Sequence, residues 1–264
     1  MESLSDPCVF ISEKMIILVY VDDCILISRE SLEIEKFIQS LTDGPEKFDF
    51  TDEGTMSSYL GVDITRHTDR KGFTLSQPFL IERIIETINF DPATTKGARG
   101  NTPATYPLLN KDENGPTRKA TWKYHGVIGM LGYLQATSRP DISMATHQCA
   151  RFNNDPKLSH ERAVKRIVRY LLDTKDKGLI FTPDVSRGLE VYVDADFAGG
   201  WKDGDHSSPE SVLSRTGFVI MYAGCPITWS SKLQTEIALS TTESEYNALS
   251  TSMRETIPFL NLLK

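Results

Sequence analysis

Cysteines are few in this chain and lie far apart. Cys8, Cys24, Cys149 and Cys225 form no C-x-x-C pair, and no cluster of histidines lies near them. This spacing argues against a structural zinc site and against a disulfide framework, and it is typical of a protein from a reducing compartment.

Long hydrophobic runs and a secretory leader are also lacking. The longest apolar stretch, around residues 15–21, is shorter than the roughly 20 residues that cross a bilayer. The first ten residues, MESLSDPCVF, contain no basic segment followed by an apolar core, so they predict no secretory signal. We therefore expect an intracellular protein with no membrane partner.

An excess of positive charge is missing as well. The net charge is −7, which is unfavourable for binding nucleic acid through phosphate contacts. It does not exclude such binding, because acidic metal ligands cluster in active sites while basic residues gather on another face. The length of 264 residues allows one large domain or two smaller ones, and 39% hydrophobic residues are ordinary for a globular protein.

The rest of the chain is organised around residues 15–28, MIILVYVDDCILIS. Two apolar, β-branched runs flank Asp22 and Asp23, which predicts two strands joined by a polar hairpin turn. Adjacent carboxylates repel each other, and a hard divalent cation such as Mg²⁺ relieves that repulsion. A solvated Asp-Asp turn is the alternative, and the preceding Tyr20 and Val21, between apolar strands, favour the metal site.

Hydrophobic periodicity predicts further elements along the chain. Helices are expected at 31–41, 77–90, 159–172 and 240–253, with two more between 122 and 152. Strands are expected at 59–64, 72–76, 189–196, 215–224 and 225–231. Gly126, Gly129 and Gly132 share a helix face, which would let another backbone approach closely. Residues 91–118 lack periodicity, so they predict an irregular connection and a domain boundary.

The helix expected at 159–172 has one apolar and one basic face. Its basic face carries Arg162, Lys165, Arg166 and Arg169. A solvated face is the usual explanation for such charges. The alternative is a track that contacts successive phosphates of a nucleic acid.

A second acidic group follows near the C-terminal end of the chain. Asp194 lies in the carboxyl end of the strand predicted at 189–196, and Glu245 lies in the last predicted helix. The order strand, hairpin, helix resembles the opening half of a ribonuclease-H-type fold, in which such residues converge on two Mg²⁺ ions. The alternative for Glu243 and Glu245 is helix capping, because Ser240-x-x-Glu243 and Thr242-x-x-Glu245 have capping-box spacing.

Several short sequence motifs resemble those of one family and occur in the same order. Tyr-Val-Asp-Asp at 20–23 resembles the metal-binding motif of reverse transcriptases. The other words are DPCVF (6–10), YLGVDI (59–64), TSRPDI (137–142), KRIVRYL (165–171), DADFAG (194–199), SRTG (214–217), WSSKLQ (229–234) and ALSTTESEY (238–246). Together they resemble the C-terminal portion of a copia-type LTR retrotransposon polyprotein, which contains a reverse transcriptase and an RNase H.

The resemblance implies an α+β fold in four segments. Residues 1–90 would form part of the polymerase palm with its hairpin, and 91–118 a linker. Residues 119–186 would form a helical thumb or connection region. Residues 187–264 would form the first part of an incomplete RNase H-like α/β domain.

The resemblance also implies roles for individual residues. Asp22 and Asp23 would bind metal at the polymerase site, and Asp194 and Glu245 at the RNase H site, with Asp196 and Glu243 as weaker candidates. Tyr20 and Val21 would lie beneath the primer terminus. The implied cofactor is Mg²⁺, two ions per complete site, or Mn²⁺. The implied partners are an RNA template, a DNA primer, an RNA/DNA hybrid and other parts of the polyprotein, in the cytoplasm, a virus-like particle or the nucleus.

The chain departs from the family pattern at both ends. The upstream palm strand with a third carboxylate and the downstream D-N-Q word of RNase H are not in this sequence. We therefore expect a fragment with little or no polymerase activity alone, and its being an enzyme stays open. One alternative is a non-catalytic nucleic-acid- or partner-binding remnant. Another is an RNase H completed in trans by a partner chain.

Overall fold

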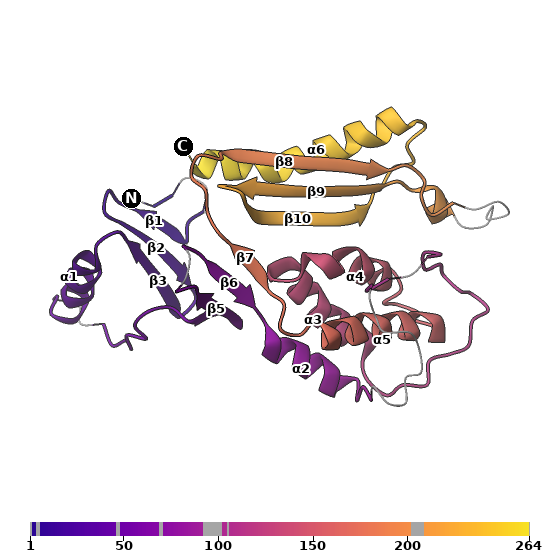
Figure 1. Ribbon diagram of the computed structural model, residues 1–264, viewed down its shortest axis with the longest axis horizontal. Coiled ribbons are helices and arrows are strands. Elements are labelled where there is room, and N and C mark those ends of the chain that lie inside the picture. Colours follow the sequence, from indigo (N-terminus) through magenta and orange to yellow (C-terminus); the bar gives the residue numbers. More distant parts are fainter. Residues whose placement is uncertain are drawn as a thin grey trace. The chain divides into compact units, whose positions relative to one another are not determined.

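The computed structural model describes residues 2–3, 6–45, 48–68, 71–91, 102–104, 106–201 and 209–263 (Figure 1). The chain divides into two compact units, one made of residues 1–55 with 254–264 and the other of 56–253. Each unit is described by itself. The four segments expected from the sequence remain a prediction.

The first unit contains a three-stranded antiparallel sheet in the order β1-β2-β3. The strands are β1 (Val9–Ile11), β2 (Met15–Tyr20) and β3 (Asp23–Ser28), and β3 leads into helix α1 (Ser31–Thr42). The predicted hairpin and the predicted helix at 31–41 are therefore confirmed. The apolar runs form strands because β-branched residues fit a pleated, half-buried surface.

The second unit begins with the antiparallel sheet β4-β5-β6-β7. Its strands are β4 (Ser58–Tyr59), β5 (Val62–Arg66), β6 (Phe73–Ser76) and β7 (Leu179–Phe181). The single strand predicted at 59–64 is wrong. Leu60 and Gly61 have φ values of 50° and 74°, so they form a two-residue turn, as tight hairpins with a glycine do.

Four helices form the main apolar core of this unit: α2 (Pro78–Thr87), α3 (Tyr124–Thr137), α4 (Ser143–Ala150) and α5 (Leu158–Asp173). A short 3₁₀ turn at Pro140–Ile142 separates α3 from α4, as predicted. The side chains buried almost completely in this core are Ile81, Ile84, Val127, Leu131, Leu134, Ile142, Val164, Ile167, Val168 and Leu171. A Cβ at Gly129 or Gly132 would meet nothing within 4 Å, so the expected close backbone approach is absent at these two described positions.

The last sheet has the order β10-β9-β8 and is antiparallel throughout, as predicted. Its strands are β8 (Leu189–Asp196), β9 (Arg215–Tyr222) and β10 (Cys225–Leu233), and a 3₁₀ turn (Pro209–Val212) precedes β9. Helix α6 (Thr241–Leu262) follows and continues through Pro258. The α+β class is confirmed.

The structure shows the state of the cysteines and the character of the helices. All four cysteines have free thiols, with Cys8 and Cys24 exposed and Cys149 and Cys225 buried. Among the described residues, no helix has both the length and the apolar character needed to cross a membrane.

Candidate functional site

The acidic hairpin turns one residue earlier than the sequence predicts. Tyr20 pairs with Asp23 across the strands, so the turn consists of Val21 and Asp22, and Asp23 is the first residue of β3. Val21 has a φ of 53° and is 81% exposed. Positive φ in a β-branched residue is strained, and such strain is concentrated at functional sites.

Asp22 and Asp23 present two exposed carboxylates at this turn. Among the described residues, no group of three or more His, Cys, Asp or Glu side chains is arranged to hold a metal ion. Two carboxylates still suit Mg²⁺, which takes one or two carboxylates and completes its shell with water and substrate phosphates. The donor set at the turn therefore fits a divalent cation that is shared with a phosphorylated substrate.

The register of the last sheet shows where Asp194 lies. Asp194 pairs with Gly217, and Asp196 pairs with Arg215. Directly paired residues share a sheet face, and the Arg215 side chain contacts His147 of α4. Asp194 and Asp196 therefore lie on the face of the sheet that adjoins α4.

Helix α6 lies on the other face of that sheet. The amide nitrogen Nε2 of Gln234 donates both to Thr216 Oγ1 at 3.2 Å and to the carbonyl of Ser244 at 2.8 Å. Thr216 follows Arg215 on β9, so its side chain is on the opposite face. In the described part of the chain, no hydrogen bond or ion pair joins Asp194 to Glu245, and their convergence on a metal stays a prediction.

The two glutamates of α6 differ in their contacts. Glu243 accepts a hydrogen bond from the backbone N–H of Leu239 at 2.7 Å, and its own N–H donates to Ser240 Oγ at 3.1 Å. These are the contacts of a capping arrangement, so the capping alternative holds for Glu243. Glu245 is exposed and remains the better candidate ligand.

The basic face of α5 has partners within the chain. Lys165 forms an ion pair with the buried Glu161 at 2.7 Å, and Arg166 donates to Thr102 through Nε and Nη2. The Arg169 guanidinium lies 5.4 Å from the ring centroid of Phe90. Arg162 is exposed. Three of the four cations therefore support the fold, and their role in binding nucleic acid stays a prediction.

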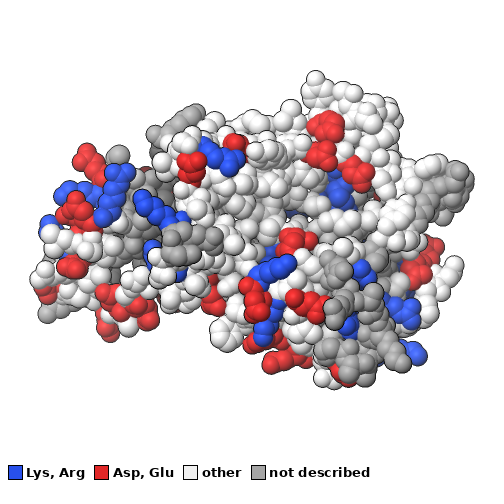
Figure 2. All heavy atoms as spheres, in the orientation of Figure 1, with Lys and Arg blue, Asp and Glu red and all other residues white. Residues whose placement is uncertain are grey.

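The visible charged surface agrees with this mixed use of basic residues. In Figure 2, basic side chains (blue) and acidic side chains (red) are interspersed on the visible surface of the described residues. Opposite charges that alternate in this way reduce the attraction of a polyanion to any one area. A phosphate-binding surface on this face would thus depend on individual side chains.

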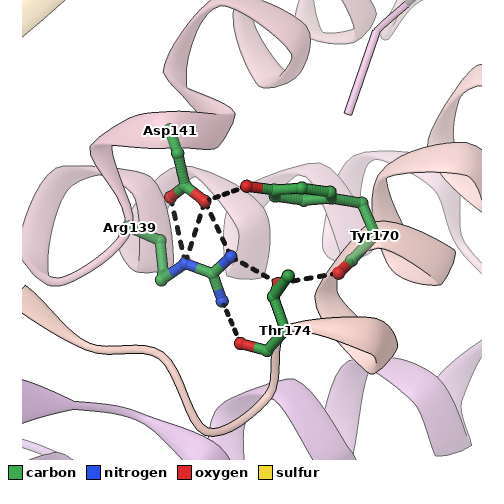
Figure 3. Close-up of polar contacts among 4 residues, drawn as sticks. All are labelled: Arg139, Asp141, Tyr170 and Thr174. Carbon is green, nitrogen blue, oxygen red and sulfur yellow. Dashed lines mark hydrogen bonds and ion pairs between the residues drawn. The ribbon is translucent and has the colours of Figure 1, made fainter. Parts of the chain in front are cut away.

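The structure also reveals a polar network that the sequence does not indicate (Figure 3). Arg139, which is 2% exposed, donates from Nε and Nη2 to both carboxylate oxygens of Asp141, the closest pair being Nη2 and Oδ2 at 2.7 Å. The hydroxyl of Tyr170 donates to the same Oδ2 at 2.7 Å. Arg139 also donates to the carbonyl of Thr174, which ends α5, at 3.1 Å. The sequence motifs TSRPDI and KRIVRYL thus contact each other in the fold, and residues of both form the hydrogen bonds that hold α5 in place.

This network changes the ionisation of its members. Burial acts to raise the pKa of the Asp141 carboxyl, but hydrogen bonds from Arg139 and Tyr170 outweigh it, so the pKa lies below its usual value. Burial, followed by the hydrogen bond to Asp141, raises the pKa of the Tyr170 hydroxyl. Asp141 is therefore charged and Tyr170 neutral at neutral pH.

Comparison with known proteins places this geometry in context. The family described as reverse transcriptase (RNA-dependent DNA polymerase) matches residues 8–101. A retrovirus-related Pol polyprotein from the tobacco transposon TNT 1-94 is 34% identical over 268 residues, covering 97% of this chain and 19% of the relative. A Pol polyprotein from the Arabidopsis thaliana transposon RE1 is 29% identical, covering 96% of this chain and 16% of the relative.

A shorter relative matches over most of its own length. The putative transposon Ty5-1 protein YCL074W of Saccharomyces cerevisiae is 31% identical over 261 residues, which cover 96% of this chain and 75% of that protein. The chain thus spans less than a fifth of the length of the two plant polyproteins. No solved structure matches the chain significantly.

Proposed function

The chain belongs to the copia-type retrotransposon Pol family of reverse transcriptases, and from this we propose that it supplies carboxylates to two sites of phosphodiester chemistry. Asp22 and Asp23 serve the addition of nucleotides to a DNA primer on an RNA template. Asp194 and Glu245 serve cleavage of the RNA strand of an RNA/DNA hybrid.

One observation carries the polymerase part of this proposal. A strained, exposed Val21 shares a two-residue turn with Asp22, and Asp23 follows at once at the start of β3. The strands hold both carboxylates in water-exposed positions, where a cation and a phosphorylated substrate reach them together. Strain of this kind costs stability, and it persists where the surrounding strands fix the turn.

The side chains of the turn have distinct tasks in this proposal. Asp22 and Asp23 would hold Mg²⁺, or Mn²⁺ in its place. When bound, Mg²⁺ supplies charge stabilisation to the oxygens of an in-line displacement. Tyr20 and Val21, both exposed, form an apolar surface beneath the primer terminus.

Fewer structural observations support the proposed RNase H role. Asp194 lies two residues before the end of β8, and Glu245 lies one turn into α6 and is not used as a cap. Asp194 and Glu245 would each bind a divalent cation next to the hybrid, with Asp196 as a further candidate. The transposon relatives lead us to propose the partners as well: an RNA template, a DNA primer, an RNA/DNA hybrid and other parts of a Pol polyprotein. For the same reason we propose that the chain acts inside the cell.

Two parallel assays on a Pol protein that contains this chain test both assignments. Asp22→Asn should lower Mg²⁺-dependent primer extension by about a hundredfold or more, because a ligand is lost at the metal itself. Cleavage of a preformed hybrid should continue. Asp194→Asn should give the opposite result.

Asp43→Asn is the matched control, because Asp43 is an exposed carboxylate at the end of α1, away from the turn. It should leave both activities unchanged. Primer extension that survives Asp22→Asn at the level of this control contradicts the polymerase assignment, and hybrid cleavage that survives Asp194→Asn contradicts the other.

A further inference from the structure

Arg215 of β9 is buried without enough acceptors. It is 7% exposed, and its Nη1 lies 3.4 Å from His147 Nδ1 and 3.2 Å from the carbonyl of Ser231, to which it donates. Its Nε and Nη2 are buried and have no hydrogen-bond partner. Buried donors are paired in nearly all proteins, so an unpaired guanidinium calls for an explanation.

The adjoining helix contributes another unpaired donor. Gln148 of α4 is 3% exposed, and its Oε1 accepts a hydrogen bond from Arg151 Nη1 at 3.2 Å. Its Nε2 is buried without a partner. Arg151 follows His147 by four residues, so the two side chains lie on one side of this helical segment. Arg215 and the adjoining helix α4 therefore contain three buried nitrogen donors without a hydrogen-bond partner, two on Arg215 and one on Gln148.

Several cations act on one another in this region. Within the described residues no ion pair of Arg151 or Arg215 is formed, although the charge of Glu210 acts on Arg151 and that of Asp196 acts on Arg215. Burial, and then repulsion from Arg151, lowers the pKa of Arg215 to about 10, although the charge of Asp196 opposes this. Burial, and then the charges of Arg215, Arg151 and Lys232, lowers the pKa of His147 to about 4, so His147 is neutral at pH 7.

We propose that Arg215, Arg151, His147 and Gln148 form a binding site for a phosphate group. A phosphate offers several acceptor oxygens and negative charge at once, and the fork of a guanidinium matches two of its oxygens. This would pair the orphaned donors and relieve the repulsion between the two arginines. The inference is independent of the assignments made for Asp22 and Asp194.

Entry of the anion requires local movement. The unpaired nitrogens are buried in the arrangement described, whereas His147 and Arg151 are only half-buried. The proposal requires these two side chains to rotate outward, so that Arg215 becomes accessible. The Arg215–His147 contact of 3.4 Å is long, and its loss costs little.

Nitrogen NMR of the arginine side chains in the full 264-residue protein tests the proposal directly. Inorganic phosphate is titrated at constant ionic strength and pH, with chloride as the balancing salt. The Nε–H signals of Arg215 and Arg151 should shift and reach saturation. The signal of Arg83, an exposed arginine of α2, should stay in place over the same range. Signals of Arg215 and Arg151 that move no earlier than that of Arg83 overturn the proposal.

Variants supply an independent measurement. Arg215→Met should weaken phosphate binding about tenfold or more, as expected for the loss of a charge-assisted hydrogen-bonded pair. Arg83→Met removes the same charge from an exposed face of α2 and should leave binding unchanged. Equal phosphate affinity in both variants overturns the proposal. If Arg215→Met does not fold, the titration of the unmodified protein decides.

The same titration identifies the source of the phosphate. A short RNA/DNA hybrid that shifts the Arg215 signal and competes with inorganic phosphate indicates a backbone phosphate. A hybrid that leaves this signal unmoved, while inorganic phosphate shifts it, indicates a small free anion. A glutamate-rich peptide that shifts it at lower concentration than either overturns the phosphate assignment in favour of a carboxylate.

Discussion

Arg139 links the turn that follows α3 to the end of α5. Its guanidinium is paired with Asp141 and with both the carbonyl and the hydroxyl of Thr174. Removing one member of such a buried arrangement leaves the other members unpaired, which costs more than the pair itself contributes. Loss of Arg139 should therefore destabilise the fold by more than its own contacts contribute.

Arg139→Ala should lower the free energy of unfolding by about 3 kcal/mol. Arg162→Ala, which also removes a helix-region arginine but from an exposed position, should change it by less than about 0.5 kcal/mol. Urea unfolding at pH 7 measures both. Equal effects of the two substitutions would contradict the structural role assigned to Arg139.

His147 should make stability depend on pH. Its pKa is about 4 in the folded chain because of burial and nearby cations, whereas an unfolded histidine titrates near pH 6.5. Between these values the unfolded chain binds more protons, so stability should fall as the pH is lowered from about 6.5 to about 4. His147→Gln should remove this part of the slope. A slope that is unchanged in the variant, measured by urea unfolding at several pH values, would refute the assignment.

At the scale of the elements, two glycines should respond oppositely to the same substitution. Gly61 has a φ of 74° in the turn between β4 and β5, where an alanine is strained. Gly129 is exposed in α3, and an added Cβ meets nothing within 4 Å.

Gly61→Ala should therefore destabilise the protein by about 1 kcal/mol. Gly129→Ala should stabilise it by about 0.5–1 kcal/mol, the helix preference of alanine over glycine. Thermal unfolding of the two variants gives the comparison. Changes of the same sign would show that the conformation of at least one glycine is misassigned.

Local patterns predicted the elements, and distant contacts limited the prediction. The β2–β3 hairpin and the helices follow from periodicity over a few residues. The turn at Leu60 and Gly61 was missed because YLGVDI alternates like a continuous strand. Strand β7 was missed because three residues reveal no period, and β7 pairs with β6 about a hundred residues earlier.

At the scale of the whole molecule, the sequence identified candidate residues better than their arrangement. Asp22 and Asp23 are adjacent in the chain, so their proximity needs no tertiary contact. Asp194 and Glu245 lie on separate elements at opposite faces of one sheet, and no local pattern predicts this arrangement. The Arg139 network and the orphaned Arg215 depend on contacts between distant segments, which a single sequence does not show.

The proposed polymerase role of the chain depends above all on divalent cation binding at the β2–β3 turn. Mn²⁺ is paramagnetic and broadens the NMR signals of the groups closest to it, so it reports binding without any enzymatic activity. Asp52 and Glu53 form the matched control, because they are also adjacent, exposed carboxylates but lie outside any strand or helix.

The decisive measurement is a Mn²⁺ titration of the full chain, followed by amide NMR. The signals of residues 21–24 should broaden at about tenfold lower Mn²⁺ concentration than those of residues 52–54, and Mg²⁺ should reverse the effect. Asp22→Asn should abolish the difference. Equal broadening at the two acidic pairs would show that the turn is an ordinary solvated surface, and the proposed polymerase site would be contradicted.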